Sequence, residues 1–193
     1  MKLALYGYGG HAREVASQID QEVTFFVDDE YSNDIAKPIS LFNPSEYMMM
    51  VAVGDSKTRF DIVQKLPKET IYFTFIHPTS LILDDNIIIG SGCFIGAYCI
   101  LTTNITLGDH SILNRGVQIG HDTKIGNYFS AMPGSVVSGN VTIYDCVYLG
   151  TNSSIKEKLS IHSLSTIGLN SGVVKDIKEP GVYGGTPSKI IKL

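Results

Sequence analysis

The stretch LGDHSILNRGVQIGHDTKIG, residues 107–126, decides the fold, because an aliphatic residue returns at every sixth position within it. Extending the step of six in both directions gives a repeat that runs from Leu83 to Val173. An α-helix, with its period of 3.6, cannot produce this spacing. The stretch therefore predicts an internal structural repeat. All sixteen repeat positions are aliphatic, and only Ala131 is small: Leu83, Ile89, Ile95, Leu101, Leu107, Leu113, Ile119, Ile125, Ala131, Val137, Ile143, Leu149, Ile155, Ile161, Ile167 and Val173.

Two further positions of the repeat are restricted in residue type. Glycine follows the aliphatic residue at 90, 96, 108, 120, 126, 150 and 168, which we interpret as a place where the backbone needs permissive dihedral angles. Four residues after the aliphatic position, small or β-branched residues recur, such as Cys93, Ser111 and Val117. Two inward positions in six residues predict a short strand followed by a corner. Three units then close a triangular coil of 18 residues, and about five coils stack at the strand spacing of about 4.8 Å.

The first 79 residues follow a different pattern. Strand-like runs at 2–6, 23–27, 48–53 and 72–76 alternate with helix-like runs at 12–19 and 57–66, the second with Ser56 as its N-cap. This order predicts a small α/β unit, Rossmann-like with a mostly parallel sheet but short for a full dinucleotide-binding domain. We therefore divide the chain into an α/β domain at 1–79 and an all-β parallel β-helix at 80–193.

Composition excludes several classes of protein. The 193 residues carry a formal net charge of −4, which argues against a nucleic-acid surface. No apolar run approaches the roughly 18 residues that span a bilayer, and the apolar run at the N-terminus is too short for a signal peptide, so we expect a cytoplasmic protein without membrane insertion. The three cysteines lack metal-ligand spacing, so we expect neither a disulfide framework nor a metal site.

Five motifs together carry a family resemblance over nearly the whole chain: GYGGHAREV (7–15), FVDDE (26–30), VAVGDSKTR (51–59), ILNRGVQIGHDTKIG (112–126) and GVYGGTPSKIIKL (181–193). With them the repeat resembles the hexapeptide acyltransferases of the sialic-acid-acetylating type, in the branch that N-acetylates nucleotide-linked 4-amino-4,6-dideoxy sugars. The resemblance implies a left-handed β-helix, a homotrimer, acetyl-CoA as co-substrate in the groove between subunits, and sugar-nucleotide binding by the N-terminal domain.

The chemistry of acetyl transfer needs a base for the nucleophile and a donor for the developing oxyanion. His121 lies two residues past Ile119, off the inward positions, so its imidazole should project outward. It also matches the family's catalytic histidine, and Asp122 matches the acidic neighbour that orients it. One coil of 18 residues places Gly139 over His121, and the matching glycine in the family holds the oxyanion with its N–H.

The remaining site residues come mainly from the resemblance. The sugar nucleotide is assigned to Gly9, Gly10, His11, Asp28, Asp29, Gly54 and Asn114. Acetyl-CoA is assigned to Ser130, Gly150, Thr151, Gly168, Leu169, Pro187 and Lys189, with Lys156, Lys158 and Lys192 as further candidates for its phosphates. Ser130 stands where the family often has a second histidine, so we give it no catalytic role.

Plainer interpretations stand beside these. The glycine-rich turn at 7–10 is also what any tight strand-to-helix connection needs, and a surface lysine is usually just solvated. Asn114 contacts His121 or the sugar, or it simply tolerates a left-handed corner. His110 is expected at the surface or an interface, whereas His77 and His162 are expected to be structural.

The leading hypothesis is N-acetylation of a nucleotide-linked amino sugar, with a dTDP or UDP carrier favoured on resemblance alone. O-acetylation of sialic acid or another sugar is the alternative, and it should not need Gly9 or Asp28. A non-enzymatic β-helix scaffold and a redox enzyme of the dinucleotide-binding type are two further possibilities. The scaffold predicts that His121→Ala changes nothing, and the redox enzyme predicts stabilisation by NAD.

Overall fold

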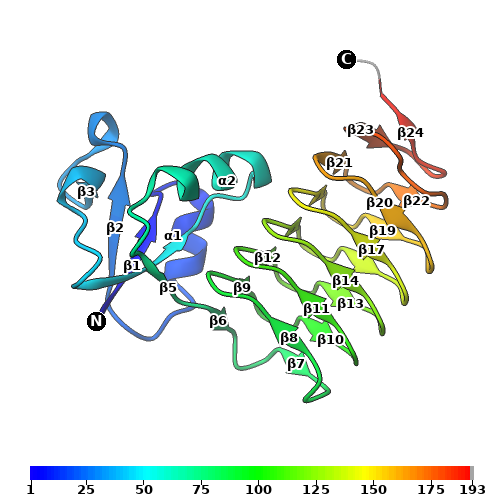
Figure 1. Ribbon diagram of the computed structural model, residues 1–193, viewed down its shortest axis with the longest axis horizontal. Coiled ribbons are helices and arrows are strands. Elements are labelled where there is room, and N and C mark those ends of the chain that lie inside the picture. Colours follow the sequence, from blue (N-terminus) through cyan, green and yellow to red (C-terminus); the bar gives the residue numbers. More distant parts are fainter. Residues whose placement is uncertain (192–193) are drawn as a thin grey trace.

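The computed structural model describes residues 1–191 as an α/β domain followed by a left-handed parallel β-helix (Figure 1). The α/β domain holds a five-stranded parallel sheet in the order β3-β2-β1-β4-β5. No helix in this described part is long and apolar enough to cross a bilayer. The elements of the domain are β1 (Lys2–Tyr6), α1 (Gly10–Ala16), β2 (Val23–Val27), η1 (Asp29–Tyr31), β3 (Ala36–Pro38), η2 (Ile39–Leu41), β4 (Tyr47–Val51), α2 (Ser56–Lys65) and β5 (Ile71–Tyr72).

The sheet of the α/β domain is covered on both faces, because successive side chains of a strand point to opposite sides and both sets are buried. Tyr6 and Met49 pack on the side of α2, whereas Leu5 and Met50 pack on α1 and on the β-helix. The predicted strand at 72–76 proves to be two strands in different sheets, because the chain leaves the α/β domain after β5. The short strand β3 was not predicted.

The β-helix consists of three parallel sheets that the chain visits in turn. We call them face 1, face 2 and face 3, and the corners between them edges 1/2, 2/3 and 3/1. Face 1 holds β6 (Phe75–Ile76), β9 (Phe94–Ile95), β12 (Ile112–Leu113), β15 (Ser130–Ala131), β18 (Tyr148–Leu149), β21 (Ser165–Ile167), β23 (Gly181–Gly184) and the antiparallel β24 (Lys189–Ile190). Face 2 holds β7 (Leu81–Ile82), β10 (Ile100–Leu101), β13 (Gln118–Ile119), β16 (Val136–Val137), β19 (Ser154–Ile155) and β22 (Gly172–Val173). Face 3 holds β8 (Ile88–Ile89), β11 (Thr106–Leu107), β14 (Lys124–Ile125), β17 (Thr142–Ile143) and β20 (Ser160–Ile161).

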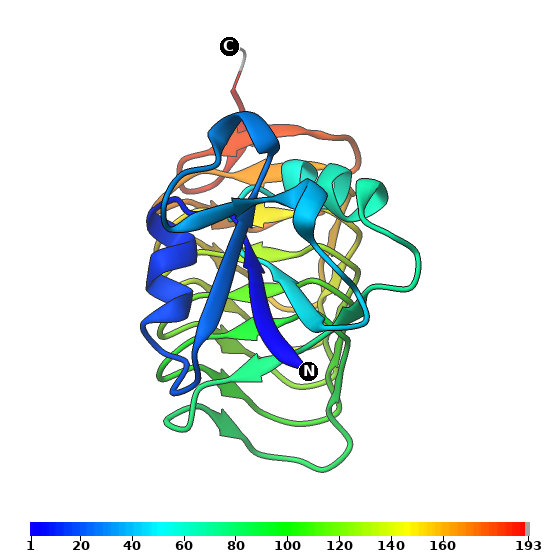
Figure 2. The same ribbon diagram turned by 90° about the vertical axis from the view of Figure 1, so that its left-hand side faces the viewer.

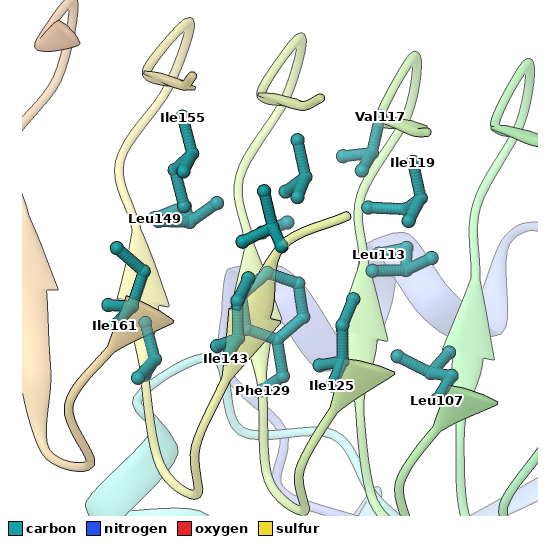
Figure 3. Close-up of a cluster of buried hydrophobic side chains, with 14 of the residues drawn as sticks. Leu107, Leu113, Val117, Ile119, Ile125, Phe129, Ile143, Leu149, Ile155 and Ile161 are labelled. Carbon is teal, nitrogen blue, oxygen red and sulfur yellow. The ribbon is translucent and has the colours of Figure 1, made fainter. Parts of the chain in front are cut away.

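The predicted aliphatic positions fill the interior of the triangular coil (Figure 3). Pairing confirms the step of 18, for example Leu101 with Ile119 and Ile119 with Val137. The first coil departs from it, because Leu101 pairs with Ile82 and one extra residue lies between β7 and β8. Leu83 is consequently 59% exposed, so the strict repeat begins at Ile89 and the predicted start at Leu83 is wrong.

The glycine that follows the aliphatic position has a different cause from the predicted one. None of these seven glycines has a positive φ. A β-carbon on Gly108 would instead lie 2.5 Å from the carbonyl carbon of Gly126 in the next coil, and one on Gly150 would lie 2.7 Å from the nitrogen of Leu169. Close stacking of the coils therefore requires glycine at 90, 108, 120, 126 and 150, where such a β-carbon would lie less than 3.0 Å from the next coil. The left-handed backbone occurs two residues later, as at Asn104, Asp122 and Asn140.

The α/β domain sits on face 1 of the β-helix (Figure 2). Phe94 and Ile112 point outward from face 1 and are buried against Leu5, Ala12 and Met50. Faces 2 and 3, and edge 2/3 between them, do not contribute to this contact cluster.

Candidate active site

Edge 2/3 carries a paired histidine and aspartate. His121 Nδ1 lies 2.7 Å from Asp122 Oδ2, and the two side chains are 57% and 44% exposed. With Asp122 as the acceptor, Nδ1 carries the proton and Nε2 keeps its lone pair. The pair therefore presents a base to solvent, as predicted for an outward position of the repeat.

The next coil leaves room for this imidazole. A β-carbon built on Gly139 would lie 2.5 Å from His121 Nε2 and 2.6 Å from Cε1. Any larger residue would displace the ring. Within residues 1–191 the Gly139 N–H has no hydrogen-bond acceptor, so it is available to a ligand beside Nε2.

Asn104 joins the same group from the coil below. Its Nδ2 donates to Asp122 Oδ1 across 2.6 Å, so both oxygens of the carboxylate are engaged. This bond, followed by the one to His121, lowers the pKa of Asp122 below its ordinary value. Sequence reasoning missed Asn104, although it lies 18 residues before Asp122 and the coil period could have revealed it.

A separate groove of about 430 Å³ opens at the carboxyl ends of β1 and β2 in the α/β domain. Gly9 and Asp28 line it, together with Tyr6, Gly7, Tyr8, Val27, Tyr31, Asn33, Val53 and Ile62. Tyr6 donates its hydroxyl to Asp28 Oδ1 at 2.6 Å. Burial, followed by this carboxylate, raises the pKa of Tyr6, so the hydroxyl stays a donor and fixes the Asp28 carboxylate at the rim of the groove.

Comparison with known proteins matches a family model to a segment of each domain. Residues 2–66 match the PglD N-terminal domain, and residues 86–121 match the bacterial transferase hexapeptide (six repeats). The chain thus joins a segment that matches the PglD N-terminal domain to a segment that matches hexapeptide repeats. We call the two parts the PglD-type domain and the hexapeptide domain below.

Several relatives are similar over most of this chain. The GDP-perosamine N-acetyltransferase of Escherichia coli O157:H7 is 25% identical over 171 residues, which cover 79% of this chain and 77% of the relative. The acetyltransferase domain of PglB from Neisseria gonorrhoeae, in complex with acetyl coenzyme A, has a TM-score of 0.84 at 25% identity and covers 98% of each chain. A mutant perosamine N-acetyltransferase from Caulobacter crescentus, in complex with CoA and GDP-perosamine, has a TM-score of 0.88 at 21% identity, covering 100% of this chain and 97% of that one.

These findings confirm the predicted fold class and the prediction that the chain is an enzyme of the acyltransferase class. The resemblance to the sialic-acid-acetylating type in particular stays a prediction.

Several residues predicted for the nucleotide lie outside the groove of the PglD-type domain. His11 packs edge-on against Phe94 at 5.9 Å, and burial lowers its pKa. Asp29 accepts from the Ser40 N–H at 3.0 Å, and Gly54 turns its carbonyl to the Ser130 hydroxyl at 2.7 Å. Gly10 is the first residue of α1 and is not among the lining residues. Of the seven predicted residues, the groove therefore gathers only Gly9 and Asp28.

Ser130 cannot serve as a cofactor contact in this fold. It is fully buried between the domains, where it donates to Gly54 O and accepts from Arg59 Nη2 at 2.8 Å. Ser56 Oγ also lies 3.1 Å from it.

The N-cap of α2 is Asp55, whose side chain accepts from Thr58 N. The prediction of Ser56 as the N-cap is therefore wrong.

Arg59 is the centre of the contact between the domains, and sequence reasoning missed it. It is fully buried and donates to the carbonyl oxygens of Val53, Gly54, His110, Tyr128 and Phe129 and to the hydroxyl of Ser130 at 2.6–3.2 Å. Burial lowers its pKa to about 10. Arg59 is a charged residue at the end of the motif VAVGDSKTR, and neither property indicates that its side chain is buried between two domains.

His110 is not at the surface but at the contact between the two domains, where its carbonyl oxygen accepts from Arg59, so the interface alternative of the prediction fits. Only 5% of it is exposed, and its ring stacks on Tyr128 at 5.1 Å and meets Tyr72 edge-on at 4.5 Å. Within residues 1–191 its Nδ1 has no hydrogen-bond partner. Burial lowers its pKa to about 4, so the ring is neutral at pH 7.

Asn114 is buried at edge 1/2, where its Oδ1 accepts from Arg115 N at 2.7 Å. Its φ is not positive, so the left-handed corner interpretation is wrong. Asn114 lies on edge 1/2 and His121 on edge 2/3, with strand β13 between them, and no hydrogen bond joins their side chains within residues 1–191.

Four of the seven residues predicted to bind acetyl-CoA form a column on edge 1/2. Gly150 and Thr151 lie directly below Gly168 and Leu169, one coil apart, and Leu169 is 70% exposed. Lys189 is exposed in β24, and Pro187 lies in the preceding turn. Lys156 and Lys158 lie instead on edge 2/3, one coil beyond Gly139, and Lys192 lies outside the described residues.

Proposed function

We propose that this protein transfers the acetyl group of acetyl-CoA to the amino group of a nucleotide-linked 4-amino-4,6-dideoxy sugar. The observation that carries the proposal is the His121–Asp122 pair, whose imidazole lies against Gly139, a residue without a side chain whose N–H has no acceptor within residues 1–191. The pair supplies a general base and the backbone supplies an oxyanion donor, which are the two requirements of acyl transfer.

The steps follow from the geometry of edge 2/3. His121 Nε2 removes a proton from the amine as the nitrogen attacks the thioester carbonyl and the C–N bond forms. The Gly139 N–H donates to the resulting oxyanion. The tetrahedral intermediate collapses with cleavage of the C–S bond, and the imidazolium returns the proton to the CoA thiolate. Asp122 stabilises the imidazolium between these steps.

A homotrimer completes the site in this proposal. The predicted CoA residues Gly150, Thr151, Gly168 and Leu169 lie on edge 1/2, whereas His121 lies on edge 2/3 of the same chain. Packing of three β-helices about an axis with face 2 turned inward would bring edge 1/2 of one subunit against edge 2/3 of the next. Acetyl-CoA then lies in the groove between Thr151 and Leu169 of one subunit and His121 and Lys158 of the other.

The groove of the PglD-type domain is the proposed seat of the nucleotide, with Gly9 against the phosphates and Asp28 as the carboxylate for the ribose or base. The E. coli relative is named for GDP-perosamine, whereas sequence resemblance favoured dTDP or UDP. The carrier nucleotide is therefore a variable of the test. The cytoplasmic location likewise stays a prediction.

The proposal is tested by thiol release and by mass spectrometry of the product. The intact protein is incubated with acetyl-CoA and with UDP-, dTDP- and GDP-linked 4-amino-4,6-dideoxyhexoses. We expect an N-acetylated product from at least one of them and a loss of about 10³-fold in kcat for His121→Gln. Asp28→Asn should raise KM for the sugar nucleotide and leave KM for acetyl-CoA unchanged. Thiol release with free sialic acid alone, insensitive to Asp28→Asn, would establish the O-acetyltransferase alternative instead.

A further inference from the structure

A third residue of edge 2/3 belongs to the chain of hydrogen bonds that ends at His121. Asn104 Nδ2 donates to Asp122 Oδ1 at 2.6 Å while Asp122 Oδ2 pairs with His121 Nδ1 at 2.7 Å. Each carboxylate oxygen has its own partner, so the carboxylate cannot rotate without breaking a bond. Residues from two successive coils therefore fix the orientation of the His121 ring.

The fold places Asn104 and Asp122 in register. They occupy the same corner position in successive coils, and both have a left-handed backbone, with φ of 51° and 57°. Their side chains therefore leave the corner in parallel. The coil below holds Asn104 in turn: Asp84 accepts from the Asn104 N–H at 3.3 Å and from the hydroxyl of Thr103.

We propose that Asn104 is a positioning residue that fixes the tautomer of His121 through Asp122, a role that rests on the proposed function. An amide NH₂ group only donates, so Asp122 remains an acceptor on both oxygens. Its second oxygen then selects the Nδ1–H form of the neutral imidazole. That form leaves the lone pair on Nε2, beside Gly139. Nε2 is the atom that accepts the proton of the amine in the proposed reaction.

Substitution can separate this role from the backbone requirement of the corner. Glycine adopts the left-handed conformation without strain, so Asn104→Gly removes the amide and keeps the turn. Asn140→Gly is the matched control: the same corner position one coil further, with φ of 58°, and no side-chain hydrogen bond within residues 1–191. Asn104→Asp places a second carboxylate against Asp122, so Oδ1 loses its donor and the two like charges repel each other.

The test combines ¹⁵N NMR of the histidine rings with steady-state kinetics on the full chain, and His121→Gln assigns the signals. We expect the Nδ1–H tautomer of His121 in the wild type and in Asn140→Gly, and a mixture of tautomers in Asn104→Gly. In the same variant kcat should fall about tenfold with both KM values within twofold, and Asn104→Asp should lose more.

Two results overturn the inference. One is an unchanged tautomer in Asn104→Gly, and the other is an equal loss of kcat in Asn104→Gly and Asn140→Gly, which would indicate a structural effect of the corner. The NMR measurement needs no substrate. A wild type that fails to acetylate any sugar nucleotide would therefore refute the proposed function while the tautomer still decides the role of Asn104.

Discussion

At the scale of single residues, His121 and Gly139 depend on each other because they occupy the same outward position in adjacent coils. In Gly139→Ala the new β-carbon would lie 2.5 Å from Nε2, so the ring must swing away from its place. We expect kcat to fall by about 100-fold or more, since base and oxyanion donor then separate. The melting temperature should stay within about 2 °C, because His121 is exposed and its displacement breaks no packing. A kcat within twofold of wild type would contradict this placement of the site.

His110 makes a second prediction at this scale, on the pH dependence of stability. Its folded-state pKa of about 4 lies below the ordinary value of 6.5, so the unfolded chain binds the proton first. The stabilising contribution is complete above about pH 6.5 and is lost as the pH falls towards 4, by up to about 3 kcal/mol. Urea titrations at several pH values measure it. His110→Phe keeps a stacked ring and should flatten the slope, and His11, whose pKa is lowered too, should contribute part of the remainder.

At the scale of the coil, the glycine after each aliphatic residue is needed for stacking. Gly108→Ala would place a β-carbon 2.5 Å from the backbone of Gly126 and force two coils apart. We expect a loss of about 1–3 kcal/mol, which lowers the melting temperature by about 3–10 °C. Tyr144→Ala changes the same corner position where a 52% exposed side chain already fits, so it should change little. Equal effects of the two substitutions would argue against a stacking role.

This glycine position also shows how far sequence reasoning reaches. The period of six revealed the coil, the inward positions and the placement of Gly139 over His121, because each is a property of the repeat. It could not distinguish a dihedral requirement from close approach between coils, since both select glycine. The extra residue before Ile89 was hidden, because Leu83 is aliphatic like its neighbour Ile82, and only the pairing of strands separates them.

The contacts between the two domains could not be predicted from the period of the repeat. Ser130, His110 and Arg59 lie on segments far apart in sequence, and nothing in their spacing relates α2 to edge 3/1. Their burial follows from how the PglD-type domain sits on face 1, which no periodicity encodes. Polar residues at such a contact are easily assigned to a ligand, as Ser130 was.

At the scale of the whole molecule, Arg59 joins the two domains without an opposing charge. Arg59→Met keeps most of the side-chain volume but leaves several buried carbonyl oxygens without a donor. We expect a loss of about 3 kcal/mol or more in the free energy of unfolding, measured by urea titration. Arg115→Met is the control: this arginine also crosses between the domains, to Glu14, but is 60% exposed and should cost about 1 kcal/mol or less. A smaller loss for Arg59→Met than for Arg115→Met would contradict the assignment.

The proposed trimer gives the most demanding prediction, because it divides one active site between two chains. His121→Gln disables edge 2/3, and Thr151→Trp blocks the exposed edge 1/2; each homotrimer should therefore be inactive. In a trimer assembled from both variants, a site is intact where edge 1/2 of a His121→Gln subunit meets edge 2/3 of a Thr151→Trp subunit. Random mixing at equal amounts makes about a quarter of the sites intact. We therefore expect denaturation and joint refolding of the two variants to restore up to about 25% of the wild-type kcat. Refolding each variant alone is the control, and a mixture no more active than its parts would show that one chain holds the whole site.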